Sequence, residues 1–214
     1  MIAFSLHAKR PDAGSKRLWR AAMVLALALQ LPGCAIPPPT SPDASNAWNA
    51  RQTRLTQLAT WQVAGRIGVI SAQEGWHASF QWVQRKPSYR IDLMGPIGQG
   101  RVVIESDGQE VRVQAQNGQS WTAPDPDDLL EQILGMRLPV NGLRYWTRGL
   151  PAPGATQVLQ TDADGRLTRL EQNGWTIEYS AYAPTSIPDL DLPKRITAQR
   201  PDLSVKLIIE QWTL

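Results

Sequence analysis

Apolar residues alternate with polar ones along most of the chain after residue 60, and this period of two constrains the fold most strongly. Strands with one buried and one solvated face produce such alternation. Turn-forming residues interrupt it at 73–75, 85–87 and 107–108, so the strands recur about every ten residues, a spacing typical of antiparallel meanders, sandwiches and barrels. The alternating apolar positions include Trp61, Val63, Gly65, Ile67, Val69, Trp76, Ala78, Phe80, Trp82, Tyr89, Ile91 and Leu93.

Three segments depart from this alternation and predict helices. Residues 48–60 carry apolar side chains near helical spacing, and an acidic stretch at 125–128 leads into the apolar run 129–134, closed by Gly135. A further short helix is expected around 142–148. Strands then resume, with a tight hairpin at Asn173-Gly174 and a last hairpin across 200–202. We therefore expect a mainly β fold with one antiparallel sheet of about ten strands, and helices covering one opening or face.

The first 34 residues have the organisation of a lipoprotein leader. A basic segment precedes an apolar run at 21–31, which is too short to span a membrane and ends in Leu31-Pro32-Gly33-Cys34. We interpret 1–33 as a signal peptide, Cys34 as the lipidated N-terminus, 34–46 as a flexible Pro- and Ser-rich tether and 47–214 as one domain. Pro32 departs from the usual lipoprotein motif. The alternative is an ordinary signal peptide cut elsewhere, which leaves Cys34 a free thiol.

The leader also accounts for the net charge of +3. It contains five of the 22 Lys and Arg residues and one of the 19 Asp and Glu residues, so the remainder is almost neutral. A near-neutral body lacks the excess of basic residues expected of a nucleic-acid-binding domain, and we predict no nucleic-acid partner.

No pattern in the sequence argues for catalysis, a cofactor or a metal. After the leader the chain has one histidine, His77, within a predicted strand, and no nucleotide-binding motif or catalytic triad signature. Asp125, Asp127 and Asp128 are more simply residues of a helix start than metal ligands. We therefore expect a protein that is not an enzyme.

Two apolar features permit a binding role. Eight of the nine tryptophans follow Cys34, most of them in predicted strands. They either fill a core or line a space for an acyl ligand between the sheet and its helical cover. The second feature is Ile97, isolated within the turn-forming segment 94–100. Because turns normally carry polar residues, Ile97 either folds back onto the core or projects as a hydrophobic finger that enters a bilayer.

The chain resembles the LolB family of outer-membrane lipoprotein acceptors and insertases. The similarity spans nearly all of the chain after Cys34. The residues that carry it are Cys34, 61–66, 82–84, 89–93, 95–100, 138–140, 144–146, 149–151, 172–175, 192–193 and Trp212.

This resemblance implies an open antiparallel half-barrel of about eleven strands with a lid of about three helices over an apolar cavity. It also implies a lipid-anchored protein on the periplasmic face of the outer membrane, which accepts lipoproteins from the periplasmic carrier LolA and inserts them into the inner leaflet of that membrane. The loop Gly95, Pro96, Ile97 and Gly98 matches the family's membrane-insertion loop, with Ile97 in place of its leucine.

From the same resemblance we expect acyl chains of the cargo to contact inward-facing apolar residues. These are Trp61, Val63, Ile67, Phe80, Trp82, Ile91, Leu93, Leu130, Ile133 and Trp146. The expected partners are LolA, lipoprotein cargo and outer-membrane phospholipid, and the expected state is a monomer. Two other functions remain open: a structural or assembly lipoprotein that binds a partner protein, and a general lipid carrier.

Overall fold

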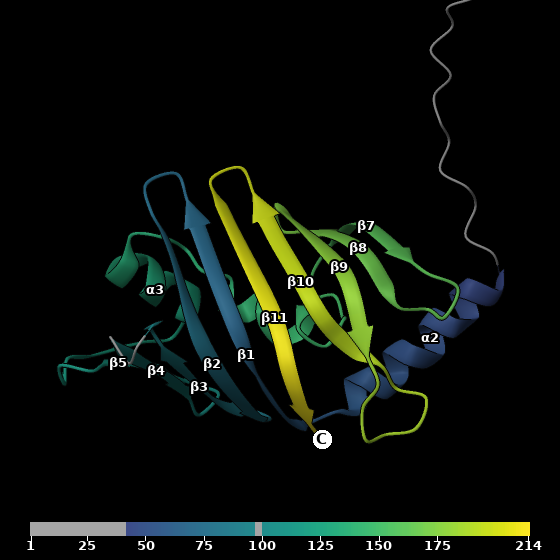
Figure 1. Ribbon diagram of the computed structural model, residues 1–214, viewed down its shortest axis with the longest axis horizontal. Helices are drawn as coiled ribbons and strands as arrows, with labels where there is room; N and C mark the ends of the chain where they lie inside the picture. The colour runs from purple at the N-terminus through teal and green to yellow at the C-terminus, as the bar shows by residue number, and fades with distance from the viewer. Residues whose placement is uncertain (1–41, 97–99) are drawn as a thin grey trace, which may run out of the picture. The chain divides into compact units, whose positions relative to one another are not determined.

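The computed structural model describes residues 42–96 and 100–214, and its main feature is one antiparallel sheet of eleven strands (Figure 1). The strands are β1 (Thr60–Ser71), β2 (Gly75–Arg85), β3 (Ser88–Met94), β4 (Arg101–Ser106), β5 (Val111–Ala115), β6 (Ser120–Ala123), β7 (Thr156–Thr161), β8 (Leu167–Gln172), β9 (Trp175–Ala183), β10 (Leu192–Arg200) and β11 (Leu203–Thr213).

The strand order places the first and last strands together in the middle of the sheet. It runs β6-β5-β4-β3-β2-β1-β11-β10-β9-β8-β7, and every neighbouring pair is antiparallel. Strands β6 and β7 are the two edges, so the sheet is open. The prediction of a mainly β, open antiparallel fold is confirmed, with eleven strands.

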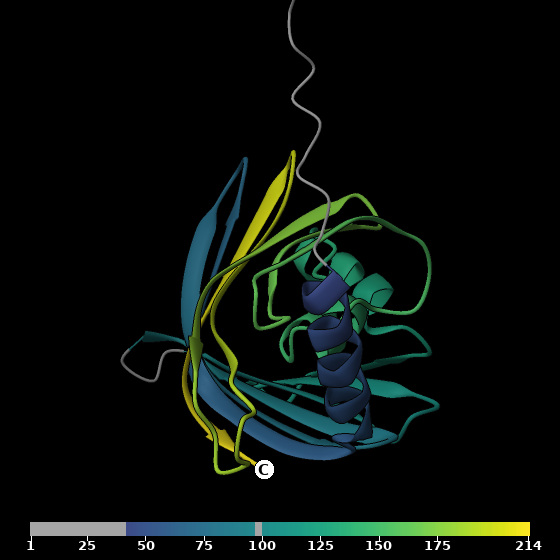
Figure 2. The same cartoon turned by 90° about the vertical axis from the view of Figure 1, so that its right-hand side faces the viewer.

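The structure describes three helices, α2 (Pro42–Gln57), α3 (Pro126–Leu134) and α4 (Val140–Trp146). Helices α3 and α4 lie in the connection between the two edge strands, and the curved sheet wraps around them (Figure 2). The Asp125 side chain caps α3 by accepting hydrogen bonds from the backbone N–H groups of Asp127 and Asp128, and Gly135 ends it in a left-handed conformation. These are the start and stop residues expected from the sequence. We call residues 126–146 the lid.

The other helices differ from the expected ranges. Helix α2 begins at Pro42 and ends at Gln57, whereas 48–60 was expected, so residues 42–46 of the expected tether are helical. Helix α4 begins at Val140, directly after Pro139, and ends before Thr147, whereas 142–148 was expected. Sequence patterns define helix ends poorly because terminal residues lack half of the intrahelical hydrogen bonds.

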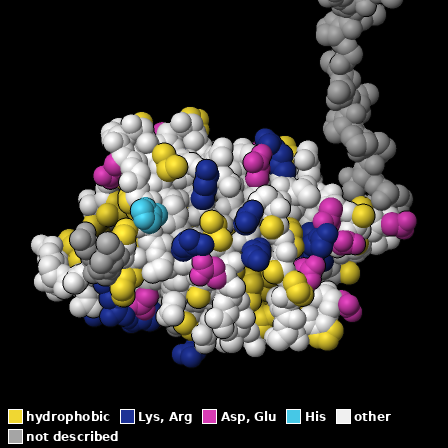
Figure 3. Space-filling view, in the orientation of Figure 1, with side chains coloured by type: hydrophobic (Ala, Val, Ile, Leu, Met, Phe, Trp, Pro, Cys, Tyr) yellow, Lys and Arg dark blue, Asp and Glu magenta, His cyan; other side chains and the backbone are white. Residues whose placement is uncertain are grey.

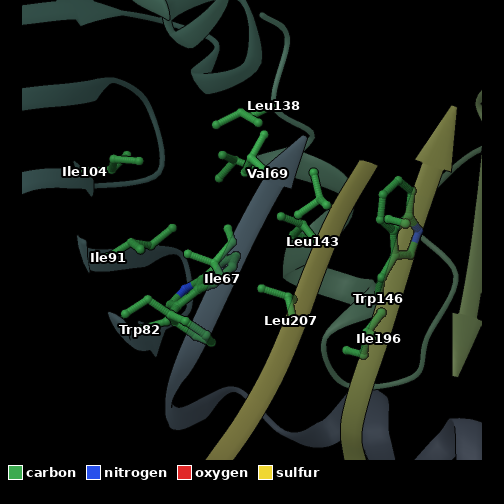
Figure 4. Close-up of a cluster of buried hydrophobic side chains, with 14 of the residues drawn as sticks. Ile67, Val69, Trp82, Ile91, Ile104, Leu138, Leu143, Trp146, Ile196 and Leu207 are labelled. Atoms are coloured by element: carbon green, nitrogen blue, oxygen red, sulfur yellow. The ribbon is translucent and has the colours of Figure 1, made fainter. Parts of the chain in front are cut away.

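The core lies between the inner face of the sheet and the lid. Alternate residues of the central strands are buried there, including Ile67, Val69 and Leu207, and they face Leu138, Leu143 and Trp146 of the lid (Figure 4). Within 42–96 and 100–214 no helix is both long enough and apolar enough to cross a membrane.

Candidate functional site

A small cavity between the sheet and the lid is the candidate binding site. Its volume is about 40 Å³, and every side chain that lines it is apolar. Strands β1–β4 and β11 contribute one wall, and α3, α4 and the segment between them contribute the other. The lining residues are Ile67, Trp76, Phe80, Trp82, Ile91, Leu93, Ile104, Leu130, Leu138, Val140, Leu143, Val205 and Leu207.

This volume is far below the roughly 300–1,000 Å³ that is typical of pockets for small-molecule ligands. An acyl chain of many methylenes does not fit into this space. Binding such a chain therefore requires the lid to move away from β1–β4, or the lining side chains to rearrange. The described conformation is thus closed, with Leu138 and Leu143 of the lid packed against the sheet at the cavity.

Six of the ten expected acyl-contact residues meet at this cavity: Ile67, Phe80, Trp82, Ile91, Leu93 and Leu130. The other four lie elsewhere. Trp61 and Val63 are buried nearer the start of β1, Ile133 is half-buried on α3, and Trp146 packs beneath α4 against β8 and β9. Residues Val205 and Leu207 were not expected at the site, although the alternation of β11 already marks them as inward-facing.

The lid is fixed to the β8–β9 side of the sheet through Trp146. Its indole N–H donates to Oε1 of buried Gln172 over 3.2 Å, and its backbone carbonyl accepts from the Tyr179 hydroxyl over 3.1 Å. Gly142 lies over the same indole, where a Cβ atom would be only 2.5 Å from the ring. Helix α4 is therefore held by polar contacts on this side, while Val140 and Leu143 border the cavity on the other.

Two arginines, one in the lid and one just after it, contact the end of α2 and the start of β3. Arg148 donates to the carbonyls of Leu55 and Leu58 over 3.0 and 3.3 Å, and burial lowers the pKa of its guanidinium. The Arg144 guanidinium lies 4.9 Å from the ring centre of Tyr89, an arrangement typical of cation–π contacts. Burial raises the pKa of Tyr89 to about 12, so its phenol is protonated and uncharged at neutral pH.

The expected insertion loop is described only at its ends. Ile97 and Gly98 lie outside the described residues, as does Cys34. The Gly95 N–H donates to the Gly100 carbonyl over 3.0 Å, which closes the base of the connection between β3 and β4. Pro96 is exposed. The structure thus places the loop between two strands of the sheet, and the role of its tip stays a prediction.

His77 is exposed on β2. In the two described ranges no group of His, Cys, Asp and Glu side chains has the arrangement of a metal site. The carboxylates at the start of α3 are engaged with the lid itself, since Asn141 donates its backbone N–H to Asp127 over 3.0 Å and its side-chain amide to Asp125 over 2.7 Å.

Asp127 makes the stability of the closed conformation depend on pH. Burial raises the pKa of its carboxyl to about 6, above the ordinary value of 3.8. The folded protein therefore binds more protons than the unfolded chain between about pH 4 and pH 6, and its stability falls as the pH rises through this window. Between about pH 4 and pH 6 we expect the free energy of unfolding of the parent, measured in urea, to fall by on the order of 2 kcal/mol. Asp127→Asn keeps an acceptor for the Asn141 N–H but cannot titrate, so the variant should not show this fall. A decrease of the same size in the variant contradicts this assignment.

Comparisons with known proteins identify the family. The family model described as "Outer membrane lipoprotein LolB" matches residues 59–212. The chain is 38% identical over 202 residues to the outer-membrane lipoprotein LolB of Pseudomonas paraeruginosa, covering 92% of this chain and 95% of that protein. It is 36% identical over 199 residues to that of Nitrosococcus oceani, covering 91% and 98%. A LolA superfamily protein from Nitrosomonas europaea superposes with a TM-score of 0.49 at 10% identity, covering 80% of this chain and 93% of that one. The family model and the relatives show that this chain belongs to the outer-membrane lipoprotein LolB family.

Proposed function

We propose that this protein accepts lipoproteins from the periplasmic carrier LolA and inserts them into the inner leaflet of the outer membrane. The observation that carries the proposal is the all-apolar cavity between the sheet and the lid, together with membership of the LolB family. The cavity would shelter the acyl chains of the cargo once the lid opens. This is a localisation function, and no step of it requires the protein to catalyse a reaction.

The energetics of the cargo explain why a sheltering protein is needed. A triacylated cysteine carries roughly 45 methylenes, and exposing each to water costs about 0.8 kcal/mol. The cargo therefore passes between apolar environments, from the carrier to this protein and then to the bilayer. Transfer can proceed without a nucleotide if each environment holds the acyl chains more favourably than the one before it.

The proposal divides the work between parts of the chain. After removal of 1–33, the lipid on Cys34 and the segment 34–46 anchor the body to the outer membrane. The domain 47–214 binds the cargo as a monomer, and Ile97, in the loop with Gly95, Pro96 and Gly98, enters the phospholipid layer. The closed base of that loop supports this division, because the hydrogen bond between Gly95 and Gly100 closes the β3–β4 ladder before residue 97.

Replacing Ile97 with glutamate tests the division. A charged side chain is costly to place in a bilayer, so we expect Ile97→Glu to accept cargo from LolA normally but to incorporate it into membranes poorly. The measurement is the transfer of a radiolabelled lipoprotein from LolA to the protein and then to vesicles, with Ile97→Leu as the control that preserves both steps. If Ile97→Glu impairs acceptance from LolA as much as incorporation into vesicles, the role of Ile97 is not confined to the membrane step.

The small size of the cavity favours a second candidate, a lipoprotein with a filled core that binds a partner protein. Titration with a fluorescent fatty acid separates the two. Saturable binding that competes with lipoprotein cargo is expected for the acceptor. Absence of saturable binding supports the partner-binding protein.

A further inference from the structure

Positive charge is concentrated on the outer face of the sheet. The charged residues of β1–β5, β10 and β11 are nine Lys and Arg but only three Asp and Glu, although the chain after the leader is almost neutral. Arg200, one of the nine, stacks on buried Trp175 on the inner face, with its guanidinium 5.2 Å from the ring centre. The other eight are exposed or half-buried. The protein is therefore electrically asymmetric, with a basic sheet and acidic remaining parts.

The three acidic residues on these strands are already paired. Asp92 contacts Arg90 and Arg101, Glu105 contacts Arg90, and Glu210 contacts Arg66 with an N–O distance of 2.9 Å.

By contrast, five of the nine basic residues enter no ion pair within the described ranges: Arg85, Arg112, Lys194, Arg195 and Lys206. Three of these five lie next to one another on β10 and β11, at the middle of the sheet. The largest group of unpaired cations is therefore there.

The strand register arranges the cations around exposed apolar side chains. Ile208 of β11 lies directly opposite Arg66 of β1 on one side and Arg195 of β10 on the other, and Lys206 precedes it by two residues on the same face. Ile208 is 39% exposed. Figure 3 shows basic side chains gathered around apolar ones over these strands.

The same line of cross-strand neighbours continues to the insertion loop. Arg66 pairs with Ser79, Ser79 with Met94, and Met94 with Arg101. Met94 is 42% exposed and, with Arg101, it forms the last residue pair before the connection 95–100. We call this line the outer row: Arg195, Ile208, Arg66, Ser79, Met94 and Arg101.

We propose that the outer row and Lys206 dock the protein on a phospholipid membrane that carries anionic headgroups. Arginine and lysine are attracted to phosphate, and aliphatic side chains beside them can reach the boundary of the acyl region. The row's continuity with the insertion loop favours a membrane over an acidic protein surface, because docking along it brings residues 95–100 to the bilayer. This inference rests on the insertion role proposed for that loop.

The test compares two charge-reversing substitutions, each of a lysine by glutamate, at different positions on the surface. The parent is the full chain with Cys34→Ala, so that no lipid anchor masks the contact. Lys206→Glu lies in the cluster, whereas Lys86→Glu lies in the β2–β3 turn; both lysines are exposed and neither forms an ion pair within the described ranges. Binding is measured by co-sedimentation with vesicles of phosphatidylcholine alone or mixed with phosphatidylglycerol, at low and high salt.

Each Lys or Arg near an anionic surface contributes about 1 kcal/mol, which corresponds to about five-fold in affinity. We expect Lys206→Glu to weaken binding to phosphatidylglycerol vesicles at least about five-fold at low salt, and Lys86→Glu to change it little. Equal effects of the two variants, or binding that does not prefer anionic vesicles, overturn the proposal. Weaker binding to LolA with unchanged vesicle binding also overturns it and assigns the face to a protein partner.

A parallel assay keeps this result separate from the proposed function. Acceptance of lipoprotein from LolA is measured for the parent and both variants. Docking by the outer row predicts normal acceptance in all three. A parent that fails to accept cargo contradicts the proposed function, whereas normal acceptance with equal vesicle binding contradicts the docking surface alone.

Discussion

Gly65→Ala is expected to destabilise the protein by about 3 kcal/mol or more. Gly65 lies on β1 at the point where its pairing with β11 shifts by one residue. A Cβ atom there would overlap the backbone carbonyl oxygen of Ile208 and stand 3.0 Å from the Ile209 Cα. Backbone atoms at the centre of an eleven-stranded sheet cannot move aside without breaking the ladder. The expected result is a lower midpoint in urea unfolding, with reduced yield of folded protein.

Gly68→Ala is the matched control on the same strand. Nothing lies within 4 Å of the position its Cβ would take, and its backbone does not have a positive φ. Alanine there should be neutral or stabilise the protein by about 0.4–1 kcal/mol, through the lower entropy of the unfolded chain. Similar losses in both variants would show that β1 tolerates no alanine at a glycine position, and that the contact with Ile208 is not the cause.

The irregular pairing beside Gly65 shows how far the sequence predicts the sheet. Alternation correctly marks the inward residues of β1, because one face packs on the core throughout. The shift in the pairing of β1 with β11 has a counterpart in the sequence of β11. There, Glu210 and Gln211 are consecutive exposed residues before Trp212. Two polar residues in succession interrupt a period of two, so the bulge has a local signal. Which glycine lies opposite depends on the long-range pairing of the chain's first and last strands, which local periodicity does not encode.

The candidate site was predictable in part for a similar reason. Periodicity identifies which side chains face inward, and Ile67, Phe80 and Ile91 do meet at the cavity. Periodicity does not predict where, between the inner face of the sheet and the lid, a cavity remains. That depends on where α3 and α4 rest, and Trp146, which faces inward as expected, is used to fix α4 over β8 and β9. The basic outer row depends on register across six strands and is hidden in a chain whose overall charge is near zero.

Trp146→Ala is expected to lower the stability by about 3–5 kcal/mol. The side chain is 1% exposed, its ring centre lies 6.0 Å from that of Trp175, and Gly142 packs on its face. Removing it leaves a void beneath α4 and takes one hydrogen-bonding partner from Gln172. Trp146→Phe retains most of the apolar volume and loses the indole N–H, so its cost should be about 1 kcal/mol. Urea unfolding of the two variants separates the packing contribution from the hydrogen bond.

The same pair of variants tests whether lid movement admits apolar ligands. Because the closed cavity of about 40 Å³ cannot hold an acyl chain, part of the binding free energy is used to enlarge it, and separating the lid from the sheet is one way to do so. Weakening the attachment of α4 lowers that cost, so folded Trp146→Ala protein should bind a fluorescent fatty acid more tightly than Trp146→Phe protein. Equal affinities despite the difference in stability would show that α4 stays in place during binding. Entry would then depend on rearrangement of side chains such as Trp76 and Leu93 at the cavity wall.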